Sequence, residues 1–201
     1  MDLGRGSSGA RFKGKLGVAV RKAFKELLVD EGRDRDAFIA ALPEPVRPLL
    51  EARYVATNWY PLDEADHLMS ASALELGVDE FELSRRIGGD VAYESAGRIG
   101  WTILSLFASP HRVARHLQTM WNQIYDSGEI ECDYDAAAGT LVVERSDWHG
   151  HAPHTCMTLL GSLERLGQNM RGYRLVEARR VCCVSEEDAE TCRFEFQFEE
   201  E

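Results

Sequence analysis

Histidine and cysteine side chains gather in one short stretch of the sequence. His149, His151, His154 and Cys156 follow one another in W-H-G-H-A-P-H-T-C. Imidazole nitrogens and thiolates are ligands that zinc and other borderline metal ions prefer. The stretch therefore predicts either a metal site in a loop, or a polar loop that leads into a helix carrying a core cysteine.

A second group of thiols lies toward the end of the chain. Cys182, Cys183 and Cys192 flank the loop of an expected hairpin, and Cys156 opens the helix before it. Because that helix must pack on the hairpin, we expect Cys156, Cys192 and one of Cys182 or Cys183 to converge. Three converging thiolates would suit a structural zinc ion. The alternative is that these cysteines are small apolar core residues.

Aromatic side chains supply a different candidate site. They are Trp59, Tyr60, Trp101, Phe107, Trp121 and Tyr125. Such residues line pockets for small apolar or aromatic molecules, although they also fill ordinary cores. We expect a cavity between a helical layer and a sheet, with Trp101, Phe107, Trp121 and Tyr125 as ligand-binding residues.

Recognisable catalytic motifs are missing from the sequence. It contains no glycine-rich phosphate loop, no G-x-S-x-G and no H-E-x-x-H, and no pair of acids stands out by its spacing. His111 and His116, on an expected helix, are candidate haem ligands, but a lone helical histidine is more often a surface or core residue. These observations predict a protein that is not an enzyme.

Charge and composition limit the partners. The net charge of −11 and the pI near 5.1 argue against nucleic acid and against an anionic membrane surface. No apolar run is long enough for a membrane span, and no signal peptide is evident. Five cysteines, an odd number, then indicate reduced thiols and a cytoplasmic location.

Periodicity predicts the elements that would position these residues. Helical spacing indicates helices over 15–29, 34–42, 64–76, 79–97, 99–107, 110–126 and 155–170. The segment 99–107 is apolar almost all round and is expected to be a buried helix. Alternation indicates strands over 54–60 and 129–134, one starting at 141, and a closing hairpin over 173–184 and 192–198. The pattern predicts an α+β domain over 15–201, with helices packed on an antiparallel sheet, after a flexible leader over 1–14.

The order of several short motifs along the chain carries a resemblance to a known family. It runs Gly77, Glu82-Leu83, Arg86-Ile87-Gly88, Ser109-Pro110, Trp121, Tyr125-Asp126-Ser127-Gly128, Cys156, Gly161, Cys182 and Cys192-Arg193-Phe194. Over roughly residues 40–198 the chain resembles a family of uncharacterised myxobacterial proteins. That family is similar to the superfamily of 4-vinyl reductase domains, haem nitric-oxide-binding domains and TRAPP subunits. The resemblance implies an α+β ligand-binding fold.

The resemblance also bears on cofactors. In sensor domains of the 4-vinyl reductase type, cysteines near the C-terminus hold a structural zinc, helped by an acid just before the second cysteine. The matching positions are Cys156, Cys182 or Cys183, and Cys192, but residues 179–181 carry no acid. Glu177 lies roughly 17 Å from Cys182 along an extended strand, so Glu187, Glu190 or a histidine would have to substitute. The haem signature Tyr-x-Ser-x-Arg is absent, so no haem is expected.

Together these observations predict a non-catalytic sensory or regulatory domain. It would bind a small, partly apolar ligand or a protein partner. One alternative is a structural adaptor that forms a homodimer, or tethers partners, without a ligand. A tetrapyrrole-related enzyme is the least favoured alternative, because no cofactor motif is present.

Overall fold

The computed structural model describes residues 9–62, 65–149, 151–186 and 189–201. Helices and antiparallel strands are both present, so the α+β class is confirmed. The helices are α1 (Gly14–Asp30), α2 (Arg35–Ala41), α3 (Arg47–Glu51), α4 (Ala65–Leu76), α5 (Glu80–Phe107), α6 (Pro110–Asn122) and α7 (Pro153–Gly167). The strands are β1 (Arg11–Lys13), β2 (Trp59–Pro61), β3 (Glu129–Asp135), β4 (Thr140–Ser146), β5 (Tyr173–Cys182) and β6 (Cys192–Glu200).

The main sheet is antiparallel throughout and has the order β3-β4-β6-β5. Its closing hairpin, β5 and β6, is the one that alternation predicted. Every second residue of β6 from Cys192 to Phe198 is buried, and the residues between them are partly exposed. One face of the sheet therefore packs on the helices and the other faces solvent, as a period of two requires.

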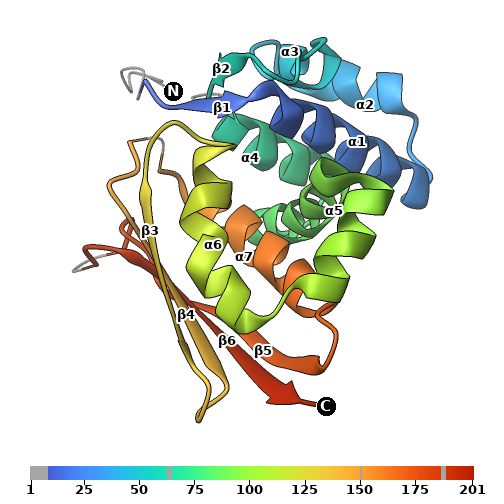
Figure 1. Ribbon diagram of the computed structural model, residues 1–201. Coiled ribbons are helices and arrows are strands. Elements are labelled where there is room, and N and C mark those ends of the chain that lie inside the picture. The colour runs from blue at the N-terminus through green and yellow to red at the C-terminus, as the bar shows by residue number, and fades with distance from the viewer. Residues whose placement is uncertain (1–8, 63–64, 150, 187–188) are drawn as a thin grey trace.

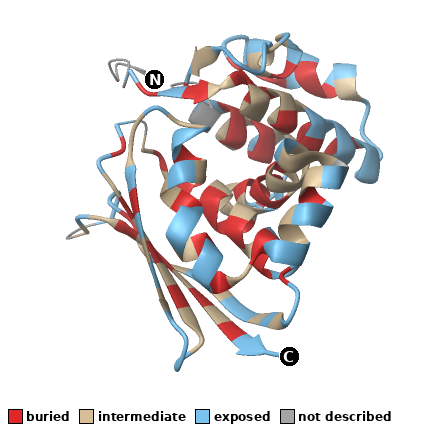
Figure 2. Cartoon of the chain, in the orientation of Figure 1, coloured by how far each residue is buried: buried red, intermediate tan, exposed pale blue. Residues whose placement is uncertain are grey.

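The helices lie in layers over the inner face of the sheet. Figure 1 shows α6 and α7 next to the sheet, with α5 and then α1 farther away. Burial follows these layers: the red residues in Figure 2 line the inner sides of the helices and the inner face of the sheet. Two apolar clusters result, one between the sheet and α6 and α7, the other among α1, α2, α4 and α5.

Two glycines set the distance between α5 and α7. A Cβ atom at Gly161 would stand 1.9 Å from the carbonyl oxygen of Arg85, and one at Gly88 would stand 2.1 Å from that of Thr158. The two helix backbones therefore touch where these glycines face them. This close contact fixes α7, which begins beside the cysteine-rich end of the sheet.

The segment 99–107 corrects one expectation. It is the last part of α5, beyond a kink at Gly97, where φ is 66°. After the kink only one side of the helix meets the core: Trp101 is buried, but Ile99 is 79% exposed and Phe107 61%. The expected buried helix is thus a half-exposed one.

The N-terminal region departs from expectation as well. Residues 11–13, placed in the expected leader, form β1 and pair with β2, and Phe12 is buried in the core. Most of the expected strand over 54–60 is turn, because only its end pairs with another strand. None of the described helices is long and apolar enough to cross a membrane.

The contact between α5 and α7 gives a first prediction. Gly161→Ala should lower the free energy of unfolding by about 2 kcal/mol, because the new methyl group meets a backbone oxygen that cannot move aside. Gly100→Ala is the matched control: it lies in α5, and the nearest side-chain atom would be 3.8 Å away. It should leave stability unchanged or raise it by up to about 1 kcal/mol. Urea unfolding measures both, and equal effects would contradict the close packing.

Candidate functional site

Four potential metal ligands meet at one end of the sheet. They are His151, Cys156, Cys183 and Cys192, and their ligand atoms all lie within 4.8 Å of one another. The Sγ–Sγ distances are 3.3 Å (156–192), 3.6 Å (156–183) and 3.7 Å (183–192). The Nε2 atom of His151 lies 3.2–3.3 Å from each sulfur.

These six distances describe a nearly regular tetrahedron. The centre of such a figure lies about 2.1 Å from each corner, close to the Zn–S and Zn–N distances of about 2.3 and 2.0 Å. Three thiolates and one imidazole are a common ligand set for structural zinc. The residues present therefore fit a tetrahedral zinc ion.

The topology explains why Cys183 belongs to this cluster and Cys182 does not. Cys182 pairs with Arg193, so both face away from the core, whereas Cys192 faces inward. Cys183 comes next in the chain and faces inward, where it is fully buried. The thiol of Cys182 instead donates a hydrogen bond to the carbonyl of Thr191. Cys182, one of the four expected metal ligands, is thus outside the cluster.

Only one of the three histidines of the loop joins the cysteines. His154 turns to the other side of α7, where its ring lies 3.1 Å from the hydroxyl of Ser70 and packs on Phe81. His149 is exposed. Of the suggested acids, Glu187 lies outside the described residues. His151 supplies the fourth potential metal ligand, in place of the acid that residues 179–181 lack.

A fully buried guanidinium borders the cluster. Arg145 is 1% exposed and stands opposite Cys192 on the inner face of β4. Its Nη2 lies 3.1 Å from the sulfur of Cys156 and 3.4 Å from that of Cys192. The guanidinium also stacks on Trp148, 4.0 Å from the ring centre. A cation in this position favours the thiolate form of its neighbours.

The proton affinities of the cluster follow from these contacts. Hydrogen bonding to Cys156 lowers the pKa of Cys192 and of Cys183, and the same bonds raise the pKa of Cys156. Burial is the largest single influence on His151 and opposes its charged form, but the hydrogen bond to Cys192 and the charges of Cys192 and Cys183 together raise its pKa. By contrast, burial alone raises the pKa of Cys132 to about 12, so that thiol stays protonated. Cys183 and Cys192 are thus predisposed to lose their protons, whereas a metal ion would have to displace those of Cys156 and His151.

A cavity of about 290 Å³ lies on the helical side of the cluster. It is enclosed by the start of α1 and by α5, α6 and α7, and most of its lining is apolar. Trp101, Trp121 and Tyr125 line it, as three of the four expected ligand-binding residues. Phe107 does not, because it lies beyond the kink and its ring packs under Arg112 instead.

The other aromatic and histidine candidates lie elsewhere. Trp59 stacks under Lys13, and Tyr60 packs on Tyr54. His111 and His116 are both exposed on α6, and the ring of His111 contacts Tyr134 on β3. Neither histidine lines the cavity.

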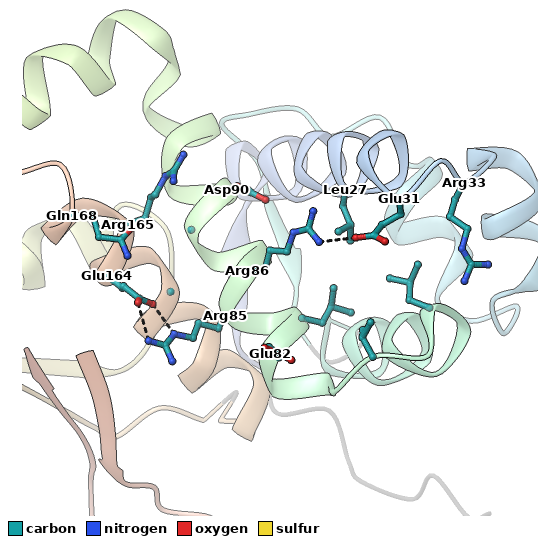
Figure 3. A pocket seen from close by; sticks show the side chains of 15 residues that line it. Leu27, Glu31, Arg33, Glu82, Arg85, Arg86, Asp90, Glu164, Arg165 and Gln168 are labelled. Atoms are coloured by element: carbon teal, nitrogen blue, oxygen red, sulfur yellow. Dashed lines mark hydrogen bonds and ion pairs between the residues drawn. The ribbon is translucent and has the colours of Figure 1, made fainter. Parts of the chain in front are cut away.

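A larger groove, of about 480 Å³, lies between α1, α5 and α7. Figure 3 shows two pairs of its charged side chains turned toward each other: Arg85 donates hydrogen bonds of 2.6 and 2.8 Å to Glu164, and Arg86 pairs with Glu31. Burial raises the pKa of Asp90, and Arg165 and Arg86 oppose that rise. Four of the charged side chains of the groove are therefore already paired within the protein.

Comparison with known proteins identifies the fold. No family model matches the sequence, and no curated protein is similar to it. Solved structures do match. An H-NOX protein from S. oneidensis in the Fe(II)NO ligation state has a TM-score of 0.67 at 14% identity, over 93% of this chain and 99% of that one. An oxygen-binding H-NOX domain related to soluble guanylate cyclases, in its oxygen complex, has a TM-score of 0.66 at 10% identity, over 93% and 95%.

The chain therefore has the fold of the H-NOX proteins, which are the haem nitric-oxide-binding branch of the resemblance noted above. A third match comes from work on modulating haem redox potential through porphyrin distortion, with a TM-score of 0.60 and 12% identity, over 93% of this chain and 99% of that one. The expectation of no haem was thus wrong. It rested on one missing signature, whereas the fold is shared with proteins that bind haem.

The lining of the cavity can be compared with the needs of a haem. An iron atom needs an axial ligand such as histidine, cysteine, methionine or tyrosine. Among the described residues that line the cavity, Met120 and Tyr125 are of these types, and no imidazole or thiol is present. A volume of 290 Å³ is also at the lower end for ligand pockets. The cavity, as the structure has it, therefore fits a haem incompletely.

The metal cluster gives a second prediction. Protein purified without chelator should carry about one equivalent of zinc, and Cys183→Ser should reduce it below about a tenth, because a hydroxyl is a poor zinc ligand. Cys182→Ser is the matched control and should keep its metal, since Cys182 faces away from the cluster. Elemental analysis decides between these outcomes. Wild-type protein without metal would leave the four residues as core side chains.

Proposed function

We propose that the protein is a non-catalytic sensory domain whose ligand site is the cavity between α1, α5, α6 and α7. The observation that carries the proposal is the cavity itself. It is an apolar space walled by Trp101 and Trp121, in a fold whose solved members bind ligands. The occupant is a small, partly apolar molecule, and haem is one of the ligands to be tested.

The metal cluster supports the cavity structurally. Trp148, which stacks on Arg145, also packs edge-on against Trp121 with ring centres 5.0 Å apart and against Tyr125 at 5.2 Å. Trp121 and Tyr125 form part of the wall of the cavity. A zinc ion on His151 and the three cysteines would fix the loop that carries Trp148, and thereby that wall. In this proposal zinc has a structural role, as in the 4-vinyl reductase domains that the sequence resembles.

A structural adaptor is the second candidate, and the exposed side of α5 favours it. Beyond Gly97, α5 carries apolar side chains that are 48–79% exposed and recur about every four residues. They are Ile99, Ile103, Leu106 and Phe107. Exposed apolar side chains in such a row are typical of contact surfaces. A dimer through this surface would need no ligand.

The cavity proposal predicts binding of a neutral apolar probe. Decanol should quench or shift the fluorescence of Trp101 and Trp121 on titration. Ala96→Phe should weaken that binding by roughly tenfold or more, because a ring would occupy space that the probe needs. Ala40→Phe, on the exposed side of α2, is the matched control and should bind as wild type does.

Hemin should be titrated in parallel, with its visible absorption as the readout. Binding that Ala96→Phe abolishes would identify the cavity as a haem site. The absence of binding by both decanol and hemin would refute the cavity proposal. Unchanged zinc content and circular dichroism would show that the variant is folded.

The adaptor alternative predicts a dimer in solution. Under that alternative, light scattering at about 100 µM should give twice the mass of one chain. Ile103→Glu should return the mass to that of a monomer, since a charge would be buried in the contact. Val29→Glu, at an exposed position of α1, should not. A wild-type monomer would exclude the homodimeric form of the adaptor.

A further inference from the structure

The cavity contains one charge. Among the described residues that line it, Lys15 alone carries a charged side chain. Lys15 lies in the first turn of α1 and is half-buried. A cation at the edge of an apolar space is costly unless an anion or water meets it.

No partner for this ammonium group is found among the described residues. Nearby lysines differ: Lys13 donates to the carbonyl of Thr57 at 3.1 Å and stacks on Trp59, and Lys22 pairs with Glu94 at 3.0 Å. Burial lowers the pKa of Lys15, and the charge of Lys13 adds to the effect. Both observations describe a desolvated cation without a counter-ion.

A hydrogen-bond donor lies at the same end of the cavity. Strand β1 lies beside the segment that follows α6. The amide of Lys13 donates a hydrogen bond to the carbonyl of Ile124 at 2.8 Å, and Phe12 forms an isolated β-bridge with Tyr125. Lys15 and Tyr125 therefore belong to adjoining segments. Burial raises the pKa of Tyr125 to about 12, so its hydroxyl remains a donor at neutral pH.

Two other hydroxyl groups of the lining are already engaged. Thr158 donates to the carbonyl of His154 at 2.9 Å, and Ser162 donates to the carbonyl of Gly88 at 2.8 Å. No partner of the Tyr125 hydroxyl is found in the described part of the chain. The side chains of Ser95 and Gln123 also line the cavity, but they can donate or accept and so do not select for charge. Lys15 and Tyr125 supply a cation and a neutral donor, and both suit an acceptor that carries negative charge.

We propose that the ligand of this cavity is an amphipathic carboxylic acid, with its apolar body between Trp101, Trp121 and Leu163 and its carboxylate held by Lys15 and Tyr125. This inference rests on the proposed function and names its ligand class. An amine would bring a second cation against Lys15 in an apolar space. A neutral ligand would leave the ammonium group without a counter-ion. Because the protein's net charge of −11 repels anions in general, the cation of Lys15 is what would make this site favourable for an acid.

The test compares three probes of equal chain length, decanoate, decanol and decylamine, by calorimetry and tryptophan fluorescence. Wild-type protein should bind decanoate roughly tenfold or more tightly than the other two, as a buried charge-assisted contact implies. Lys15→Met keeps the apolar stem and should abolish the preference while leaving decanol affinity unchanged. Lys15→Arg should preserve the preference.

Lys13→Met is the matched control, because Lys13 is two residues away but does not line the cavity. It should retain the preference for decanoate. Equal wild-type binding of decanoate and decanol would overturn the acid while leaving the cavity's function intact. Equal affinity of wild type and Lys15→Met for decanoate would also overturn the proposed acid, because the ammonium group of Lys15 would then point to solvent and not to the ligand. Failure of all three probes to bind wild type would instead refute the cavity as the ligand site.

Discussion

The buried guanidinium of Arg145 imposes the strictest constraint on this structure. A cation that is 1% exposed must be offset by nearby acceptors. Among the described residues, the acceptors within hydrogen-bonding distance of its Nη2 atom are the sulfurs of Cys156 and Cys192. Its Nη1 atom has no partner among the described residues. A thiolate at Cys192, whose pKa is lowered by its hydrogen bond to Cys156, would offset the charge of the guanidinium. One zinc ion with three thiolates and a neutral imidazole has a net charge of −1, which the guanidinium balances.

Satisfying that constraint draws together parts of the chain that are far apart in sequence. Arg145 comes from β4, Cys192 from β6 and Cys156 from α7, and Trp148 comes from the loop that covers them. The same tryptophan contacts the wall of the cavity. The candidate metal centre and the cavity are thus two sides of one packed unit. Trp148 links them, and so does Arg145, whose guanidinium also lies 5.8 Å from the centre of the Trp121 ring.

The sequence predicted the regular elements well because their periodicity is strong. The apolar row of β6 and the caps Asp79 and Ser109 give unambiguous signals, and the structure places strand and helix starts accordingly. It failed at 99–107 because an apolar segment beyond a glycine kink does not reveal which side will be buried. Alternation along 141–145 does place Arg145 on the inner face beside Leu141 and Val143, and this available signal was missed. The choice between Cys182 and Cys183 depended on the register of β5 against β6, which no local pattern encodes.

The shared fold explains less about the ligand than the side chains do. Proteins at 10–14% identity can keep one backbone arrangement while every group that touches a ligand changes. In this chain the helical histidines of α6 are exposed, and the cavity behind them presents tryptophan rings, a protonated phenol and one ammonium group. Those groups differ from one another in charge, size and hydrogen-bonding capacity, so together they restrict the ligand far more than the fold does. In the proposed function, the lining of the cavity rather than the shared fold determines what can occupy it.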